Sequence, residues 1–129
     1  MESYTYQPIG YVHSPFKDRN SAPKFYTDSG DTTATLEILP EYQDALMSIK
    51  PGMNLMMIFA FHKSTEHSLQ VYKRGTGPLT GVFATRSTRR PNLIGVSIIK
   101  IVDIKDTTIT FTGVDTLDGT PVLDLKLAD

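Results

Sequence analysis

The chain has 129 residues, of which 40% are hydrophobic and 21% charged, and its formal net charge is −1 at pH 7. This length and composition are those of an ordinary soluble protein, and they predict one domain over residues 1–129 with a hydrophobic core of its own. The absence of cysteine excludes disulfides, thiolate metal ligands and a cysteine nucleophile. The near-neutral net charge argues against a general polyanion binder.

The N-terminal sequence MESYTYQ has neither a basic start nor an apolar run, so we expect no secretory signal. The longest apolar run covers residues 55–61, far fewer than the about 20 residues that a membrane-spanning helix needs. We therefore expect a cytoplasmic protein with no membrane partner.

The basic residues are unevenly distributed along the chain. No acidic residue lies between Glu66 and Asp103, whereas the basic residues in that interval are Lys73, Arg74, Arg86, Arg89, Arg90 and Lys100. Such segregation can present one basic face to a phosphate backbone even when the total charge is near zero. The alternative is that these cations pair with the C-terminal aspartates, and the sequence leaves both interpretations open.

The first half of the chain predicts three strands and one helix. Residues 6–13 and 33–39 alternate between apolar and polar side chains, as half-buried strands do. Residues 40–49 begin with proline and carry an apolar stripe, which indicates a short helix packed on the core. Residues 53–61 are continuously apolar and predict a strand buried on both faces. His62 follows directly, and its residue chemistry alone favours a hydrogen-bonded structural role over a general base or a stacking partner.

The second half predicts further short strands. Residues 68–73 form one, and the glycine-containing loop at 74–78 lacks the Gly-Lys-Ser/Thr ending of a nucleotide-binding P-loop, which argues against an NTPase. A strand is expected at 82–84, and 96–104 with 108–114 are expected to form a β-hairpin.

The chain then turns at Gly119, for which a positive φ is expected, and ends in a strand around 122–125. Many short strands with one or two short helices predict a mainly β fold, a small antiparallel β-barrel. A dinucleotide-binding fold is disfavoured because no glycine-rich strand–turn–helix is present.

An arginine-rich loop separates the strands expected at 82–84 and 96–104. Arg86, Arg89 and Arg90 precede Pro91, which restricts the backbone there. Guanidinium groups fork onto carboxylates or phosphates and stack on flat rings, so this loop is a candidate binding site, although a solvated basic loop is the alternative. The three histidines lack metal-ligand spacing, so no metal site is predicted.

Three separated segments also carry a family resemblance. They are PIGYVHSPF at 8–16, the arginine loop with FATRS, RRPN and IG within 83–95, and DGTPVLD at 118–124. In this order they resemble the TrmO (TsaA-like) family of tRNA methyltransferases over nearly the whole chain. The resemblance implies an S-adenosylmethionine-dependent enzyme that methylates N6 of a threonylcarbamoyl-adenosine beside the tRNA anticodon. It also implies a homodimer with the cofactor near the interface.

The resemblance suggests roles for particular residues, although it identifies no catalytic residue. The cofactor-binding residues it implies are Pro23, Lys24, His62, Lys63, Arg86, Val96, Thr116, Leu117, Asp118, Gly119, Thr120 and Pro121. The RNA-binding residues proposed with it are Arg89, Arg90, Lys73 and Arg74.

The chain departs from the family pattern at three places. Phe25 stands where glutamine is usual, Leu93 stands where proline is usual, and residues 126–129 replace the usual Lys-Pro-Tyr continuation. We therefore expect the family's C-terminal extension to be absent. The alternatives are methylation of a smaller acceptor and a non-catalytic module that binds or senses S-adenosylmethionine.

Overall fold

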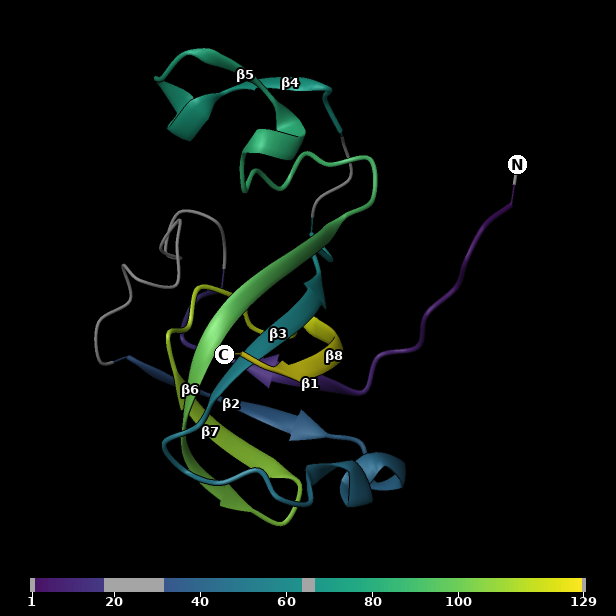
Figure 1. The fold of residues 1–129 in the computed structure, drawn as a ribbon, viewed down its shortest axis with the longest axis vertical. Helices are drawn as coiled ribbons and strands as arrows, with labels where there is room; N and C mark the ends of the chain where they lie inside the picture. The colour runs from purple at the N-terminus through teal and green to yellow at the C-terminus, as the bar shows by residue number, and fades with distance from the viewer. Residues whose placement is uncertain (1, 18–31, 64–66, 129) are drawn as a thin grey trace.

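Six antiparallel strands close into a barrel in the order β1-β2-β7-β6-β3-β8 (Figure 1). The computed structural model describes residues 2–17, 32–63 and 67–128. The barrel strands are β1 Gly10–His13, β2 Thr33–Ile38, β3 Asn54–Ala60, β6 Ile94–Lys105, β7 Thr108–Thr112 and β8 Pro121–Leu127. The predicted mainly β antiparallel barrel is confirmed.

The chain between β3 and β6 forms a small insert, defined here as residues 67–93, that lies beyond one end of the barrel (Figure 1). In it, β4 (Gln70–Tyr72) pairs with β5 (Leu79–Gly81) as a separate two-stranded sheet. The short 3₁₀ helices η3 (Lys73–Gly75) and η4 (Val82–Ala84) follow these strands.

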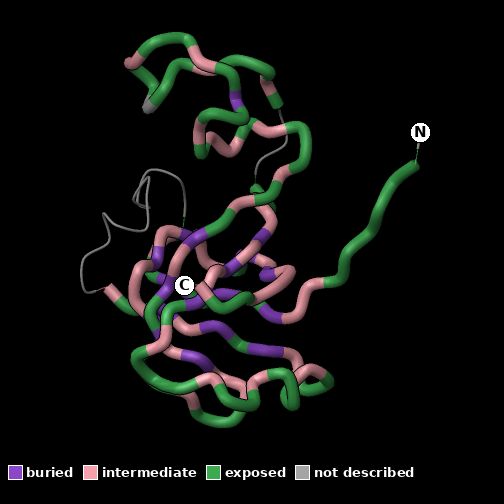
Figure 2. The backbone as a smooth tube through the Cα atoms, viewed as in Figure 1, coloured by how far each residue is buried: buried purple, intermediate pink, exposed green. Residues whose placement is uncertain are grey.

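The hydrophobic core fills the barrel, because buried residues alternate with more exposed ones along its strands. Figure 2 shows the buried positions along the barrel strands. In β7, Ile109 and Phe111 are buried between partly exposed threonines, as the alternation predicted. In β2, Leu36 and Ile38 are buried in the same way. Burying one such side chain contributes about 1.5–3 kcal/mol, so this interior is the main stabilising element of the fold.

The prediction that residues 53–61 are buried on both faces was wrong. In β3 only alternate residues, Leu55, Met57 and Phe59, are fully buried, and the side chains between them are half-buried. A barrel strand has one inner and one outer face, and the outer face of β3 carries apolar side chains too. The continuous apolar run therefore does not mean burial on both sides.

The helix expected over 40–49 is a 3₁₀ helix, η2, that spans Pro40–Leu46. It ends early because the backbone turns at Ser48, whose φ is 75°. Of the predicted core-facing stripe, Leu46 and Ile49 are partly buried against the core, whereas Ala45 is exposed, and no residue of η2 is fully buried. Among the described residues, no helix is long and apolar enough to cross a membrane.

The strand expected at 82–84 is instead the 3₁₀ helix η4. The backbone N–H and the side-chain hydroxyl of Thr85 both donate to the carbonyl of Val82, at 3.1 and 2.8 Å, and this closes a helical turn. The β6–β7 hairpin was predicted correctly, with Asp106 at φ 55° in its turn. Gly119 has the predicted positive φ, at 83°.

Gly10 is expected to be intolerant of a side chain, because a Cβ atom there would lie 2.4 Å from the carbonyl oxygen of Glu37 on β2. Gly10→Ala should lower the free energy of unfolding by about 1–3 kcal/mol, the usual cost of overpacking a closed structure. Urea unfolding measures this. Gly81→Ala is the control, because no atom lies within 4 Å of the added carbon. Equal stability of Gly10→Ala and wild type would contradict the packing argument.

Candidate functional site

A cleft of about 1370 Å³ separates the end of the barrel from the insert. One wall comes from β3, β6 and the segment 115–120, and the other comes from β4, β5, η4 and the arginine loop. Residues far apart in the sequence meet here because β3 and β6 are paired neighbours whose ends lead into and out of the insert.

Most of the residues singled out in the sequence line this cleft. Of the expected cofactor-binding residues, those in the lining are His62, Lys63, Arg86, Val96, Thr116, Leu117 and Thr120. Asp118, Gly119 and Pro121 lie outside the lining, and Pro23 and Lys24 fall outside the described residues. Of the expected RNA-binding residues, Lys73, Arg89 and Arg90 line the cleft. The side chain of Arg74 is not among those described.

The apolar floor of the cleft includes Phe59, Phe61 and Gly95. The two phenylalanine rings pack edge to face, with centroids 5.4 Å apart. A Cβ atom on Gly95 would lie 2.6 Å from the Phe61 ring and 2.7 Å from the Phe59 ring. The glycine of the IG element therefore lets two aromatic side chains lie directly against the backbone of β6.

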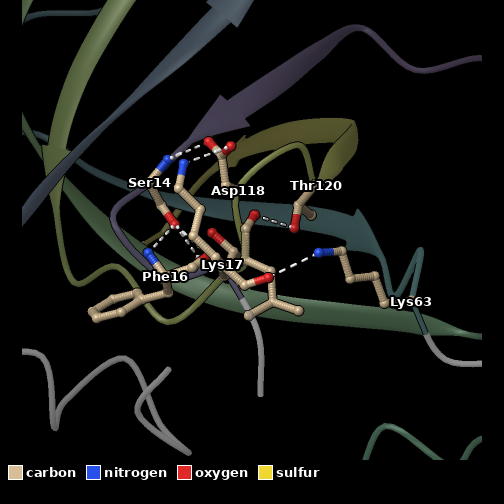
Figure 3. Close-up of polar contacts among 8 residues, drawn as sticks. Ser14, Phe16, Lys17, Lys63, Asp118 and Thr120 are labelled. Atoms are coloured by element: carbon tan, nitrogen blue, oxygen red, sulfur yellow. Dashed lines mark hydrogen bonds and ion pairs between the residues drawn. The ribbon is translucent and has the colours of Figure 1, made fainter. Parts of the chain in front are cut away.

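The carboxylate of Asp118 is engaged by the segment that follows β1 (Figure 3). Its Oδ1 accepts from the backbone N–H of Ser14 at 3.0 Å, and its Oδ2 accepts from Lys17 Nζ at 2.9 Å. The Lys17 hydrogen bond first, and then the Ser14 N–H, lower the pKa of Asp118. This side chain joins two segments of the chain and does not reach into the cleft.

Further hydrogen bonds lie around the turn at 116–120: one joins it to the segment after β1, one closes the turn itself, and one joins Lys63 to that same segment (Figure 3). Ser14 Oγ donates to the Thr116 carbonyl at 2.8 Å, and Thr120 Oγ1 donates to the Leu117 carbonyl at 2.6 Å. Lys63 Nζ donates to the Lys17 carbonyl at 2.8 Å. The cleft-facing part of the turn is thus fixed from behind by polar contacts.

His62 lies in the cleft two residues after the end of β3. Partial burial of the imidazole is the main cause that lowers its pKa, and the positive charge of Lys63 adds to this effect. A hydrogen bond with the Asp118 backbone acts in the opposite direction without cancelling it. His62 is therefore neutral at pH 7.

The three arginines of the loop have different surroundings in the structure. Arg86 donates from its guanidinium to the Val96 carbonyl, across the loop. Arg90 Nη1 donates to the carbonyls of Val82 and Thr85, at 3.1 and 2.8 Å. Arg89 is exposed on the rim of the cleft. Arg86 and Arg90 thus brace the loop, which leaves Arg89 presented to solvent.

Asp115 and Phe83 are among the cleft residues that were not selected from the sequence. Asp115 is the first residue of the turn predicted over 115–121, and Phe83 belongs to η4 and is 80% exposed. The available signal for Asp115 was its position just after a predicted strand and beside the DGTP element. The available signal for Phe83 was its place at the start of the FATRS motif, but it was assigned to a strand.

One buried polar atom suits a ligand. Thr116 is 3% exposed and lines the cleft, and its Oγ1 finds no hydrogen-bond partner among the described residues. Buried hydroxyls are almost always paired, so an orphan in a cleft wall indicates a partner supplied from outside the protein. The residues present therefore fit a ligand that carries polar groups.

The fold and the cleft together define a small closed β-barrel domain with a candidate ligand-binding cleft between the barrel and the insert. The family described as tRNA-methyltransferase O N-terminal domain matches residues 11–127, and the chain belongs to that family. The resemblance seen in the three sequence segments is thereby confirmed.

Individual relatives agree with this assignment. A probable S-adenosyl-L-methionine-binding protein of Pyrococcus abyssi is 38% identical, with 94% of this chain and 66% of the relative covered. The tRNA (adenine(37)-N6)-methyltransferase of Escherichia coli is 33% identical, with 98% and 58% covered. The crystal structure of TrmO from Pseudomonas aeruginosa superposes with a TM-score of 0.82 at 33% identity, over 99% of this chain and 57% of that one. The chain thus spans less than two thirds of the length of these relatives.

The orphan hydroxyl of Thr116 gives a test of the cleft that is independent of folding. Thr116→Val keeps the shape and removes a hydroxyl with no partner among the described residues, so the free energy of unfolding should stay equal or rise. S-adenosylmethionine affinity, measured by calorimetry, should fall by about 1–2 kcal/mol. Thr120→Val is the contrast, because its hydroxyl bonds to Leu117 and its loss should lower stability. Unchanged affinity of Thr116→Val would remove this hydroxyl from the site.

Proposed function

We propose that this protein binds S-adenosylmethionine in the cleft and transfers its methyl group to N6 of adenine 37 in tRNA, beside the anticodon. The observation that carries the proposal is that the family match extends over residues 11–127 and that residues implied by the resemblance line one cleft. The names of relatives from Pyrococcus abyssi and Escherichia coli, which bind this cofactor or methylate this base, support it. We further propose that the acceptor adenosine carries the threonylcarbamoyl group.

The size of the cleft suits two ligands. Pockets for one small molecule measure about 300–1,000 Å³, whereas this cleft measures about 1370 Å³. The barrel wall, with Thr116 and His62, would hold the cofactor, and the insert wall would face the acceptor. Each reactant would then contact its own wall.

The chemistry asks the protein mainly to position its reactants. When bound, S-adenosylmethionine supplies an electrophilic methyl group. The protein then has to align the acceptor nitrogen and exclude water. Phe59 and Phe61 supply an apolar floor that excludes water, and the neutral imidazole of His62 can accept a hydrogen bond. Arg86 fixes the loop over β6 through the Val96 carbonyl.

The first experiment is calorimetric titration of the protein with S-adenosylmethionine, followed by a methylation assay on tRNA with and without the threonylcarbamoyl group. We expect saturable binding that Arg86→Ala weakens at least about tenfold, since that change unties the loop from Val96. Lys100→Ala is the control, because Lys100 is exposed on β6 outside the cleft lining. Binding without methylation of either tRNA would favour a sensing module or a smaller acceptor. No binding would refute the proposal.

The insert should contact the tRNA backbone through Arg89. Arg89→Ala should weaken tRNA binding and reduce the slope of log affinity against log salt by about 1, as expected for one lost phosphate contact. Fluorescence anisotropy at several salt concentrations measures both quantities. Arg90→Ala should instead lower the thermal stability, because Arg90 holds the carbonyls of Val82 and Thr85. If Arg89→Ala binds tRNA with the wild-type slope, the backbone contact lies elsewhere.

We also propose that the protein forms a homodimer through the insert. Large apolar side chains are exposed there: Leu69 (71%), Tyr72 (63%), Leu79 (55%) and Phe83 (80%). Tyr72, Leu79 and Phe83 also line the cleft. Soluble monomers rarely expose large apolar patches, so this many exposed apolar side chains in one short insert supports a partner surface. Light scattering should give twice the chain mass for wild type and the monomer mass for Leu79→Asp. A monomeric wild type at micromolar concentration would rule the dimer out.

A further inference from the structure

We propose that Asp115, positioned by the buried hydroxyl of Ser97, binds the positively charged sulfonium end of the methyl donor. This inference rests on the proposed function. It assigns the charge of the donor to a residue that neither the sequence motifs nor the relatives' names single out.

The backbone brings Asp115 to β6 through a turn that requires glycine. Gly113 follows β7 with φ 87°, and a Cβ atom there would lie 2.9 Å from the Ile98 carbonyl oxygen. This close approach presses the segment after β7 against β6. Val114 is then fully buried, and Asp115 reaches the cleft.

Ser97 is a polar residue in an inward-facing position of β6 and is completely buried. Its Oγ donates to Asp115 Oδ1 at 2.6 Å. A buried hydroxyl is costly unless it is paired, and a hydroxyl–carboxylate bond of this length is a strong one. Ser97 therefore fixes the carboxylate from inside the barrel and acts as a positioning residue.

Asp115 is the one acidic residue among the described side chains of the cleft lining, and all the other charged residues there are basic. Those residues are Lys63, Lys73, Arg86, Arg89 and Arg90. Such a lining attracts phosphates and repels a cationic ligand. A sulfonium ion needs a compensating negative charge near it, and within the described lining only Asp115 supplies one.

The orphan hydroxyl of Thr116 is an independent sign that a ligand approaches this point. Thr116 is the next residue in the chain, and it is buried with Oγ1 unpaired among the described residues. A carboxylate and an adjacent hydroxyl in the same wall suit a ligand that carries positive charge beside polar groups. The donor's reacting end has this character.

The test compares two ligands that differ in charge at sulfur. S-adenosylmethionine carries a sulfonium cation, and S-adenosylhomocysteine has a neutral thioether at the same place. For Asp115→Asn, calorimetry should show the dissociation constant for S-adenosylmethionine rising about tenfold or more, and that for S-adenosylhomocysteine changing less than about threefold. Asp103→Asn, an exposed carboxylate on β6 outside the cleft lining, should change neither.

A second variant guards against misfolding. Ser97→Ala keeps the carboxylate of Asp115 but removes the hydroxyl that holds it. The affinity for S-adenosylmethionine relative to that for S-adenosylhomocysteine should therefore fall, by a smaller factor than in Asp115→Asn. Ser97→Thr, which keeps a hydroxyl, should restore the wild-type ratio. Equal losses for both ligands in Asp115→Asn would place Asp115 on a group that they share, and unchanged affinities would remove it from the donor site. Either result overturns the inference while wild-type binding still supports the proposed function. If wild type binds neither ligand, both ideas fail.

Discussion

The structure depends on how β1 closes the barrel. This strand pairs with β2 along its length and with β8 at two positions, Gly10 with Val122 and Tyr11 with Pro121. Beyond these pairs, Val12 exchanges backbone hydrogen bonds of 2.9 and 2.7 Å with Thr120 and Gly119. The bonds that complete the ring therefore also fix the 116–120 turn, which forms part of one wall of the cleft. The same contacts therefore close the barrel and hold this part of the site.

The two walls of the cleft have different origins. The barrel wall is supported by the hydrophobic core and by the network around Asp118, so its groups are held rigidly in place. The insert has one fully buried apolar side chain among its described residues, Val82. It is organised instead by main-chain bonds and by Arg90. A wall with so little buried apolar surface is suited to a large ligand or to a second subunit.

Several features were predictable because they depend on local chemistry. Alternation of apolar residues located β2 and β7, and the turn at Asp106 located the hairpin. The cleft lining was found in part, since motifs at 83–95 and 118–124 marked Arg86 and Thr120. Burial of β3 was not predictable, because an apolar run does not show which neighbours cover each face. Asp118 was predicted in the site because it belongs to a motif. In the structure its carboxylate binds Ser14 and Lys17, which lie about a hundred residues away in the sequence, and no local pattern indicates such a pairing.

The sequence by itself determined the class of fold, the family and the basic character of the region between Glu66 and Asp103. These follow from periodicity, motifs and composition, which are properties of neighbouring residues. Only the tertiary structure decided which charges meet. It joined Asp115 to Ser97, paired the Arg90 guanidinium with carbonyls of its own loop and left the buried hydroxyl of Thr116 without a hydrogen-bond partner among the described residues. Such pairings arise when barrel closure brings distant strands together, and no local pattern records which residues will then lie side by side.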